Sequence, residues 1–400
     1  MSWLVVGSCL AWALVVMLAL GLRSRAYAIF RGIQLGLHTL IALAIAPTTP
    51  PLLVLFIYLH ASVYLHSLSL VRPRLRPLWY RALISLPSAF FGAGTLLALP
   101  WALAAALGWH LPAVWLPYAA ALLGLVQSLT VREEQVDVVV ADGSVPGLRR
   151  HVTGAERVER PLRIVQITDP HLGPFMSVGR LRSIVESAVR RDPDLVLLTG
   201  DFLTMESQSD PALLATALEP LLAIRGRAFA CFGNHDHEAP ATVRHALTHA
   251  GVQLLMDESA IVHTGAGPVH IIGADFVFRG REAHLARLCA DHPRVPGTLR
   301  LLLLHDPSAF RHLPEGEADL VLSGHTHGGQ VGLVSLGLPW TMMRLFVKAP
   351  DHGLWARGTD RLYVHRGTGH YGFPLRIGVP AENSLLQVHA PGLEASLGPS

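Results

Sequence analysis

The stretch Gly233-Asn234-His235-Asp236 directly follows the apolar residues Phe229-Ala-Cys-Phe232. A short apolar run that stops at glycine and polar side chains is typical of a buried strand that ends at a site. Asn offers a neutral oxygen ligand, His a proton donor or a ligand, and Asp an orienting carboxylate. The same four residues also suit an ordinary turn, so their meaning depends on the rest of the chain.

Four other apolar runs end in the same way. Each has an ordinary alternative, such as a turn or a helix cap, when taken alone. Helix-like segments lie between the runs, which indicates α/β layering, and a later strand-rich stretch indicates a second sheet. Ligands of α/β folds collect where the strands end, and alternating histidines in an extended segment face one side. The four runs are Leu162–Thr168 before Asp169 and His171, Asp194–Thr199 before Gly200 and Asp201, Leu299–Leu304 before His305, and Leu320–Leu322 before Gly324, His325 and His327.

In this order the five blocks resemble the signature of the calcineurin-like metallophosphoesterase superfamily. The resemblance covers roughly Pro161–Val388, with every ligand position filled. One departure is Pro170, where Leu is more usual. The tail from Arg366 to Glu382 is similar to that of the membrane-anchored bacterial subgroup, and the apolar N-terminus is similar to that of transmembrane proteins with a metallophosphoesterase domain. The resemblance implies a four-layer α/β/β/α sandwich.

The resemblance also implies a two-metal site whose ions, Mn, Fe, Zn or similar, activate a bridging hydroxide for in-line attack on phosphorus. Oxygen and imidazole ligands suit such ions, and the lack of Cys ligands disfavours a structural zinc. His235 is expected to stabilise the transition state and to protonate the leaving oxygen, with Asp236 orienting it. The metal ligands are expected to be Asp169, His171, Asp201 and His327 for one ion, and Asp201, Asn234, His305 and His325 for the other, with Asp201 bridging.

The first third of the chain reads as a membrane region. No Asp, Glu or Lys occurs before Glu133, and mean hydropathy over the whole chain is +0.39. Five apolar runs are each long enough to span a bilayer. Arginines lie in the first and third breaks between the runs, so the positive-inside rule predicts an outside N-terminus and a cytoplasmic globular half, in the inner or plasma membrane. The runs are roughly Trp3–Leu22, Tyr27–Ala46, Pro51–Leu70, Ala82–Leu107 and Leu111–Thr130.

These patterns predict a transmembrane region of about five helices at residues 1–130, a connector at 131–160, the metallophosphoesterase domain at 161–390 and a disordered tail at 391–400. Four histidines lie in or beside the spans. We expect neutral imidazoles bonded to a neighbouring helix or lying near the interface, rather than a haem or metal site, because no carboxylates accompany them. They are His38, His60, His66 and His110.

The charge distribution argues against nucleic-acid binding, and the cysteine content argues against a disulfide framework. The sequence pI of 8.9 comes largely from the membrane half, so nucleic-acid binding is not expected. Cys9, Cys231 and Cys289 are scattered, which agrees with a cytoplasmic domain without disulfides. The many apolar residues of Val331–Pro350 suit either ordinary packing or a surface that dips into the membrane or binds an acyl chain, with Arg344 and Lys348 meeting lipid phosphates.

The sequence thus predicts a membrane-anchored phosphohydrolase acting on a phosphoester or pyrophosphate. A lipid-linked substrate is the narrower hypothesis, since bacterial members of the superfamily include enzymes that cleave the pyrophosphate of UDP-2,3-diacylglucosamine. The alternative is a metal-bound signalling or scaffold domain that regulates the membrane region. A transporter-like membrane half is disfavoured by the lack of acids in the spans. The sequence carries no signal for an oligomeric state.

Overall fold

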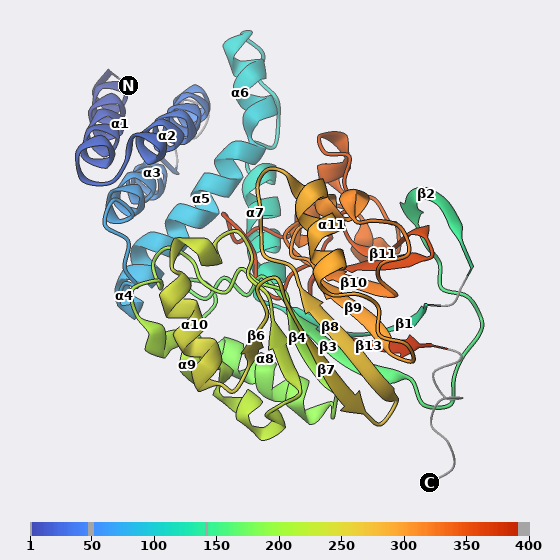
Figure 1. The fold of residues 1–400 in the computed structure, drawn as a ribbon. Coiled ribbons are helices and arrows are strands. Elements are labelled where there is room, and N and C mark those ends of the chain that lie inside the picture. The colour runs from blue at the N-terminus through green and yellow to red at the C-terminus, as the bar shows by residue number, and fades with distance from the viewer. Residues whose placement is uncertain (1, 47–51, 141–142, 391–400) are drawn as a thin grey trace. The chain divides into compact units, whose positions relative to one another are not determined.

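The computed structural model describes residues 2–46, 52–140 and 143–390 (Figure 1). The chain divides into a helical unit and an α/β unit, with the first break between Leu129 and Thr130. Two later segments, Met205–Ser207 and Gly372–Ile377, belong to the helical unit. The predicted tail at 391–400 lies outside the described residues.

The helical unit begins with two helices that are long and apolar enough to cross a membrane. They are α1, Ser2–Leu22, and α2, Arg25–Ile45, with mean hydropathies of 2.4 and 1.6 over their apolar parts. Ser24 separates them and caps α2, because its hydroxyl accepts a hydrogen bond from the Tyr27 backbone N–H. The first two predicted spans are therefore present as helices.

The other three predicted spans also contain helices, but these are shorter or bent. α5 and α6 meet at an angle of 54°, next to Pro100, which has no N–H to continue the helical ladder. As one bent span they would bring the number of membrane-crossing helices to three. A total of five spans stays a prediction. The elements are α3 (Leu53–Ser69), α4 (Leu78–Tyr80), a π-helical turn (Arg81–Ser85), α5 (Leu86–Leu97), α6 (Leu99–Ala106) and α7 (Leu116–Ser128).

The buried histidines of the helical unit bond to neighbouring helices, as expected. His60 on α3 lies 2.9 Å from the Ser8 hydroxyl on α1 and 3.2 Å from the ring of His38 on α2. The ring of His66 lies 3.3 Å from the Ser85 hydroxyl. These contacts join helices to one another, so they account for imidazoles inside an apolar bundle.

The α/β unit contains two sheets. The six-stranded sheet has the order β1-β13-β3-β4-β5-β6, and the seven-stranded sheet has the order β2-β11-β12-β10-β9-β8-β7. Neighbours among β3, β4, β5 and β6 are parallel, and so are β8, β9, β10 and β12. The strands are β1 (Val131–Val139), β2 (Val145–Arg150), β3 (Leu162–Ile167), β4 (Leu195–Leu198), β5 (Ala228–Ala230), β6 (Gln253–Leu254), β7 (Glu258–Thr264), β8 (Gly267–Gly273), β9 (Leu299–Leu303), β10 (Leu320–Ser323), β11 (Gly353–Gly358), β12 (Asp360–Val364) and β13 (Ala381–His389).

Alternating side chains of these strands build three apolar layers, which confirms the four-layer sandwich. On β4, Leu195 and Leu197 point between the sheets, and Val196 and Leu198 point to the outer helices. The helices α8, Val178–Arg190, α9, Pro211–Leu218, and α10, Pro240–His249, cover the six-stranded sheet. The helix α11, Arg281–Asp291, covers the other sheet (Figure 1).

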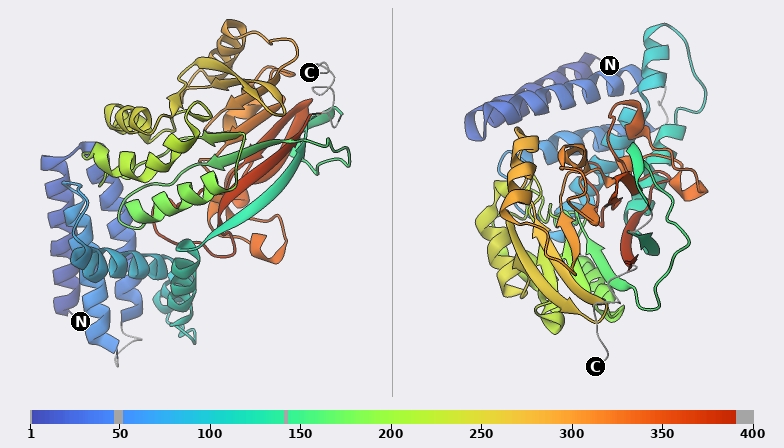
Figure 2. Two further views of the ribbon diagram at one scale, coloured as in Figure 1. Left: turned by 90° about the horizontal axis from the view of Figure 1, so that it is seen from below. Right: turned by 45° about the vertical axis from the view of Figure 1, so that its right-hand side comes forward.

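The predicted connector at 131–160 is instead an integral part of the fold. β1 pairs in parallel with β13 along nine residues, from Val131 opposite Ala381 to Val139 opposite His389. Figure 2 shows the red strand β13 running beside the teal strand β1. β2 pairs with β11 in the other sheet. The region therefore supplies an edge strand to each sheet as well as connecting the two parts of the chain.

Candidate metal centre

The five predicted strand-end blocks lie together at one end of the sandwich. β3, β4 and β5 bring Asp169, Asp201 and Asn234 from one sheet, and β9 and β10 bring their histidines from the other. Parallel strands that end at one edge cause this convergence. Glycine is required where the blocks touch, because a Cβ on Gly233 would collide with the Asp201 carboxylate and lie 2.7 Å from the His305 ring.

Six of the predicted ligands form two groups. In each group, one potential ligand atom per residue lies within 4.8 Å of the others. The first group is Asp169, His171 and His327, with 3.2 Å between the two Nε2 atoms and 3.5 Å from Asp169 Oδ1 to His327 Nε2. Their side chains are almost fully buried.

The second group is Asp201, His305 and His325, and Asp201 also reaches the first group. His305 Nε2 lies 3.2 Å from His325 Nδ1 and 3.3 Å from Asp201 Oδ2. The same Oδ2 atom lies 3.8 Å from Nε2 of His171, which belongs to the first group. Asp201 therefore stands between the two groups, in the position expected of a bridging ligand.

The seventh predicted ligand, Asn234, has a buried side-chain oxygen, Oδ1, without a hydrogen-bond partner among the described residues. A buried polar atom without a partner is costly in a protein interior. The preceding residue, Gly233, lies against the Asp201 carboxylate and the His305 ring, and a buried amide oxygen next to such groups fits a divalent cation. This atom is the feature of the structure that fits a metal best.

His305 is held in the orientation that a metal ligand needs. Its Nδ1 atom lies 2.6 Å from the Thr199 carbonyl oxygen, so Nδ1 carries the proton and donates it to the other sheet. The Nε2 atom is then the one that faces Asp201. Fixing the far nitrogen of a histidine in this way is a recurrent feature of metal sites.

The backbone at the site is strained. Five of the six residues in the two groups, all but His305, have positive φ angles between 44° and 65°. Non-glycine residues rarely adopt this left-handed region, and holding one there costs on the order of 1–3 kcal/mol. Strain of this kind collects at functional sites. The residues are Asp169, His171, Asp201, His325 and His327.

Burial and neighbouring charges set the protonation of the cluster. Burial raises the pKa of Asp169 to about 6, and burial lowers the pKa of His171 and of His325 to about 4. Burial lowers the pKa of His305 as well, but the carboxylates of Asp201 and Asp169 outweigh burial and raise this pKa to about 10. His171 and His325 are therefore neutral near pH 7, which is the form that binds metal.

His235 is paired with Glu238 and not with Asp236. The Nδ1 atom of His235 lies 2.7 Å from Glu238 Oε1, and Glu238 Oε2 accepts a hydrogen bond of 2.8 Å from Gln208. Burial lowers the pKa of His235, but the Glu238 hydrogen bond and the Asp201 carboxylate outweigh burial and hold the pKa above its ordinary value. Glu238 was missed by the sequence analysis, because its role depends on the short 3-10 helix Asp236–Glu238.

Asp236 contacts backbone amides instead. Its Oδ2 accepts hydrogen bonds of 2.7 Å from the amides of Asp201 and Gly233, and its Oδ1 accepts one of 2.9 Å from the Phe202 amide. The prediction that Asp236 orients His235 is therefore wrong for this structure. The carboxylate joins the exit of β4 to the exit of β5, and so it positions Asp201.

Aromatic rings flank the cluster on two sides, and no sequence motif indicated them. The Tyr371 ring stacks on His235 with 5.1 Å between ring centroids and lies 5.4 Å from His171. The Phe276 ring lies 6.2 Å from His305 and 6.3 Å from His325. Asp306, next to the ligand His305, has a structural role, because it caps the turn at Ser308 and pairs with Arg281.

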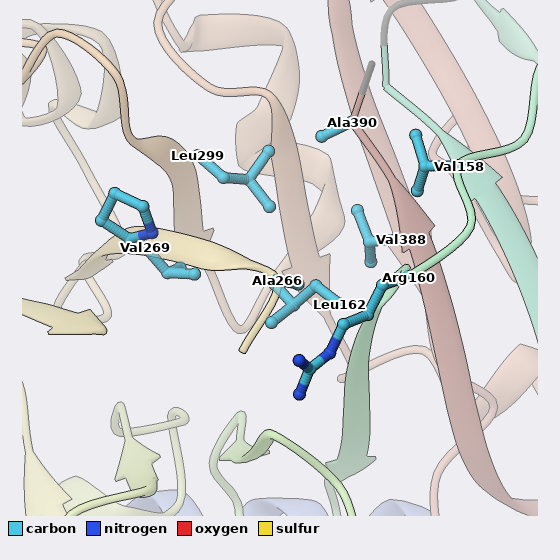
Figure 3. A pocket seen from close by; sticks show the side chains of 9 residues that line it. Val158, Arg160, Leu162, Ala266, Val269, Leu299, Val388 and Ala390 are labelled. Atoms are coloured by element: carbon cyan, nitrogen blue, oxygen red, sulfur yellow. The ribbon is translucent and has the colours of Figure 1, made fainter. Parts of the chain in front are cut away.

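A small pocket at the opposite end of the sandwich is not part of this site (Figure 3). It is lined by the first residues of β3 and β9, Leu162 and Leu299, whereas the metal ligands follow the last residues of these strands. Figure 3 shows mostly apolar side chains around it, with the Arg160 guanidinium as the charged group. No predicted site residue lines it.

Comparison with known proteins agrees with this geometry. Residues 162–329 match the family model of the calcineurin-like phosphoesterases. The chain is 29% identical to phosphodiesterase YaeI of Escherichia coli over 233 residues, which are 57% of this chain and 82% of that protein. It is 30% identical to a transmembrane protein with metallophosphoesterase domain from Danio rerio over 239 residues, 55% of this chain. That match spans 52% of the zebrafish protein, so the chain covers about half of this relative's length.

Solved structures give a weaker likeness. The phosphopantetheinyl hydrolase of Mycobacterium tuberculosis is 15% identical, with a TM-score of 0.28 over 42% of this chain and 84% of that chain.

The family match begins at the first residue of β3 and ends at Gly329, two residues after His327, so it spans all five strand-end blocks. This chain therefore contains a calcineurin-like metallophosphoesterase domain.

Proposed function

We propose that the protein is a membrane-anchored phosphohydrolase that uses two divalent metal ions. The observation that carries this proposal is the position of Asp201, whose Oδ2 atom lies between the two ligand groups. When bound, two such ions would lower the pKa of a water between them and neutralise phosphate oxygens. The ion identity, Mn, Fe, Zn or similar, follows from the oxygen and imidazole donors.

We assign the ligands to the two ions according to their groups. Asp169, His171 and His327 would hold one ion, His305, His325 and Asn234 would hold the other, and Asp201 would serve both. Two ions carry more positive charge than the two ligand carboxylates cancel, so the site would attract a phosphate anion. His235, outside the ligand set, donates a proton to the leaving oxygen, and Glu238 holds its ring in place.

We further propose that the substrate is a lipid-linked phosphoester or pyrophosphate and that the catalytic domain is cytoplasmic. The candidate membrane helices α1 and α2 support the first point, because they would keep enzyme and lipid in one membrane. The arginines between the apolar runs support the second. A reporter fused after Ser400 that is active only outside the cytoplasm would contradict the proposed topology.

The experiment that tests the activity is a substrate screen of the full chain in detergent micelles. The purified protein is loaded with Mn²⁺ and assayed against a phosphomonoester, a phosphodiester and a lipid pyrophosphate. The metal content per chain is measured by mass spectrometry on the same sample. Hydrolysis of one class together with about two ions per chain supports the proposal. Bound metal without hydrolysis of any class would favour the scaffold alternative.

A further inference from the structure

The segment Leu333–Val347, here named the apolar lip, exposes an unusual number of large apolar side chains. The described remainder of the α/β unit contributes five exposed large apolar residues, Val152, Leu222, Ile261, Phe278 and Tyr371. Ordinary packing therefore does not account for the lip, and a concentrated exposed apolar patch indicates a binding surface. Its eight exposed residues are Leu333, Leu336, Leu338, Trp340, Met342, Leu345, Phe346 and Val347, with Phe346 79% exposed.

The apolar lip is attached firmly to the metal-binding turn. The lip begins six residues after His327. The Met342 amide in the lip donates a hydrogen bond of 2.8 Å to the carbonyl of Val331, which lies between His327 and the lip. Asp351 ties both parts together. Its carboxylate accepts a hydrogen bond of 2.7 Å from Thr341 in the lip, and its carbonyl accepts one of 2.6 Å from Thr326.

Thr326 lies between the ligands His325 and His327 in the sequence. The hydrogen bonds of Asp351 to Thr326 and Thr341 therefore fix the position of the lip relative to the metal centre. The tip of the lip consists of two short 3-10 helices, Val334–Leu336 and Met342–Leu345, with no buried residue in either. A rigid apolar projection beside the ligand turn is therefore available to a partner.

The charged residues of this segment indicate which kind of partner it binds. No Asp or Glu occurs between Asp319 and Asp351, whereas Arg344 and Lys348 lie in or next to the lip. Exposed apolar side chains flanked by basic residues, without acids, suit the headgroup region of an anionic bilayer. The chain also carries α1 and α2, which are apolar and long enough to hold it at a membrane.

We propose that the apolar lip is a second membrane contact that inserts into the headgroup region of the bilayer. Phe346, Leu345 and Leu336 enter the apolar boundary, and Arg344 and Lys348 meet lipid phosphates. The metal centre beside the lip then faces phosphoesters at headgroup depth. This last point rests on the proposed function, whereas membrane insertion of the lip does not.

Insertion is tested by a fluorescent label on the full chain reconstituted into vesicles with phosphatidylglycerol. In a Cys9→Ser background, Phe346→Cys is labelled with an environment-sensitive dye, and Val152→Cys, 87% exposed in the same unit, is the matched control. We expect a blue-shifted emission at position 346 that spin-labelled lipids quench, and neither effect at position 152. Equal emission at the two positions would overturn the proposal. A blue shift without quenching by lipid would show a protein contact, such as a second copy, and would also overturn it.

The consequence for the substrate is tested separately by activity. Leu345→Ser combined with Phe346→Ser is assayed on a lipid pyrophosphate in vesicles and on bis(p-nitrophenyl) phosphate in solution. We expect at least a tenfold loss on the vesicle substrate and an unchanged rate on the soluble one. An equal loss on both substrates would contradict the substrate part of the proposal. If the unaltered chain hydrolyses neither, the proposed function fails, and the quenching result still decides the insertion.

Discussion

The carboxylate of Asp236 accepts a hydrogen bond of 2.7 Å from the backbone amide of Asp201, the residue that lies between the two ligand groups. With its bonds to the amides of Gly233 and Phe202, this carboxylate fixes the exits of two neighbouring strands. Asp236 is therefore placed to determine metal binding through the position of Asp201.

We expect Asp236→Asn to weaken metal binding by about 10–100-fold, the usual effect of losing a group that orients a ligand. The amide nitrogen of Asn would face a backbone N–H and leave at least one buried donor without an acceptor, at about 1–3 kcal/mol. Mn²⁺ affinity by calorimetry on the full chain measures the effect. Unchanged affinity would show that Asp236 has no part in positioning Asp201.

Asp201→Asn is expected to abolish hydrolysis of a generic phosphodiester in the presence of Mn²⁺. The substitution removes the charge of the carboxylate that both ligand groups share, and an amide presents one oxygen in place of two. Initial rates of the metal-loaded chain provide the measurement. The control is Asp210→Asn at the N-cap of α9, where Asn caps about as well as Asp. Full activity of Asp201→Asn would exclude a bridging role.

His235→Ala is expected to keep the metal but to lose about 10²–10⁴-fold in turnover, as for a proton donor. Glu238→Gln is expected to lose about 10–100-fold, because it weakens the group that orients the ring. Turnover and metal content are measured on the same preparations. His245→Ala, an exposed histidine on α10, is the control. Metal loss in His235→Ala would assign His235 to the ligand set instead.

The sequence was enough to predict that the site residues lie together, because parallel strands end at one edge of a sheet. Asp169, Asp201 and Asn234 follow three such strands, and this relation is already present in the order of the sequence. Where their side chains then point depends on left-handed φ angles, such as 56° at Asp201, which the pattern does not encode. For that reason the partner of Asp236 was misassigned.

Long-range pairing explains the other differences. β1 pairs with β13, about 250 residues later in the chain, and its polar run around Glu133 and Glu134 carries no indication of that partner. Tyr371 reaches His235 only through the loop after β12. In the helical unit, hydropathy located the apolar runs, but the bend beside Pro100 divides one of them into α5 and α6.

Tyr371→Ala is expected to lower turnover by up to about tenfold, whereas Tyr371→Phe retains it. The ring stacks on His235, and an aromatic contact of this kind contributes about 0.5–1.5 kcal/mol. Both variants are compared by kcat and KM on a soluble phosphodiester, and we expect the change in kcat. Equal impairment of the two variants would assign the effect to the hydroxyl group rather than to the stacked ring.

The buried pair of Glu382 and Arg366 gives the domain a specific dependence on pH. Glu382 Oε2 lies 2.6 Å from Arg366 Nη2, and Oε1 accepts hydrogen bonds from the Arg366 amide and the Tyr363 hydroxyl. Burial opposes ionisation, but Arg366 outweighs it and lowers the pKa of Glu382 from 4.5 to about 2. The stabilisation is therefore complete above pH 4.5 and is lost as the pH falls towards 2, and it amounts to about 3 kcal/mol.

We expect Glu382→Gln to lower the free energy of unfolding by about 3 kcal/mol at pH 7, since it removes the buried carboxylate that pairs with Arg366 and leaves that charge with the more exposed Glu134. The difference from the unaltered chain should shrink between pH 4.5 and pH 2, where Glu382 itself becomes neutral. Urea unfolding followed by circular dichroism at pH 7, 4 and 2.5 measures both effects. Glu258→Gln, at an exposed position at the start of β7, is the control and should shift the curves little. A difference that stays constant across this range would contradict the ionised pair as the source of the stabilisation, because Glu382 is the only titrating group in which the two chains differ.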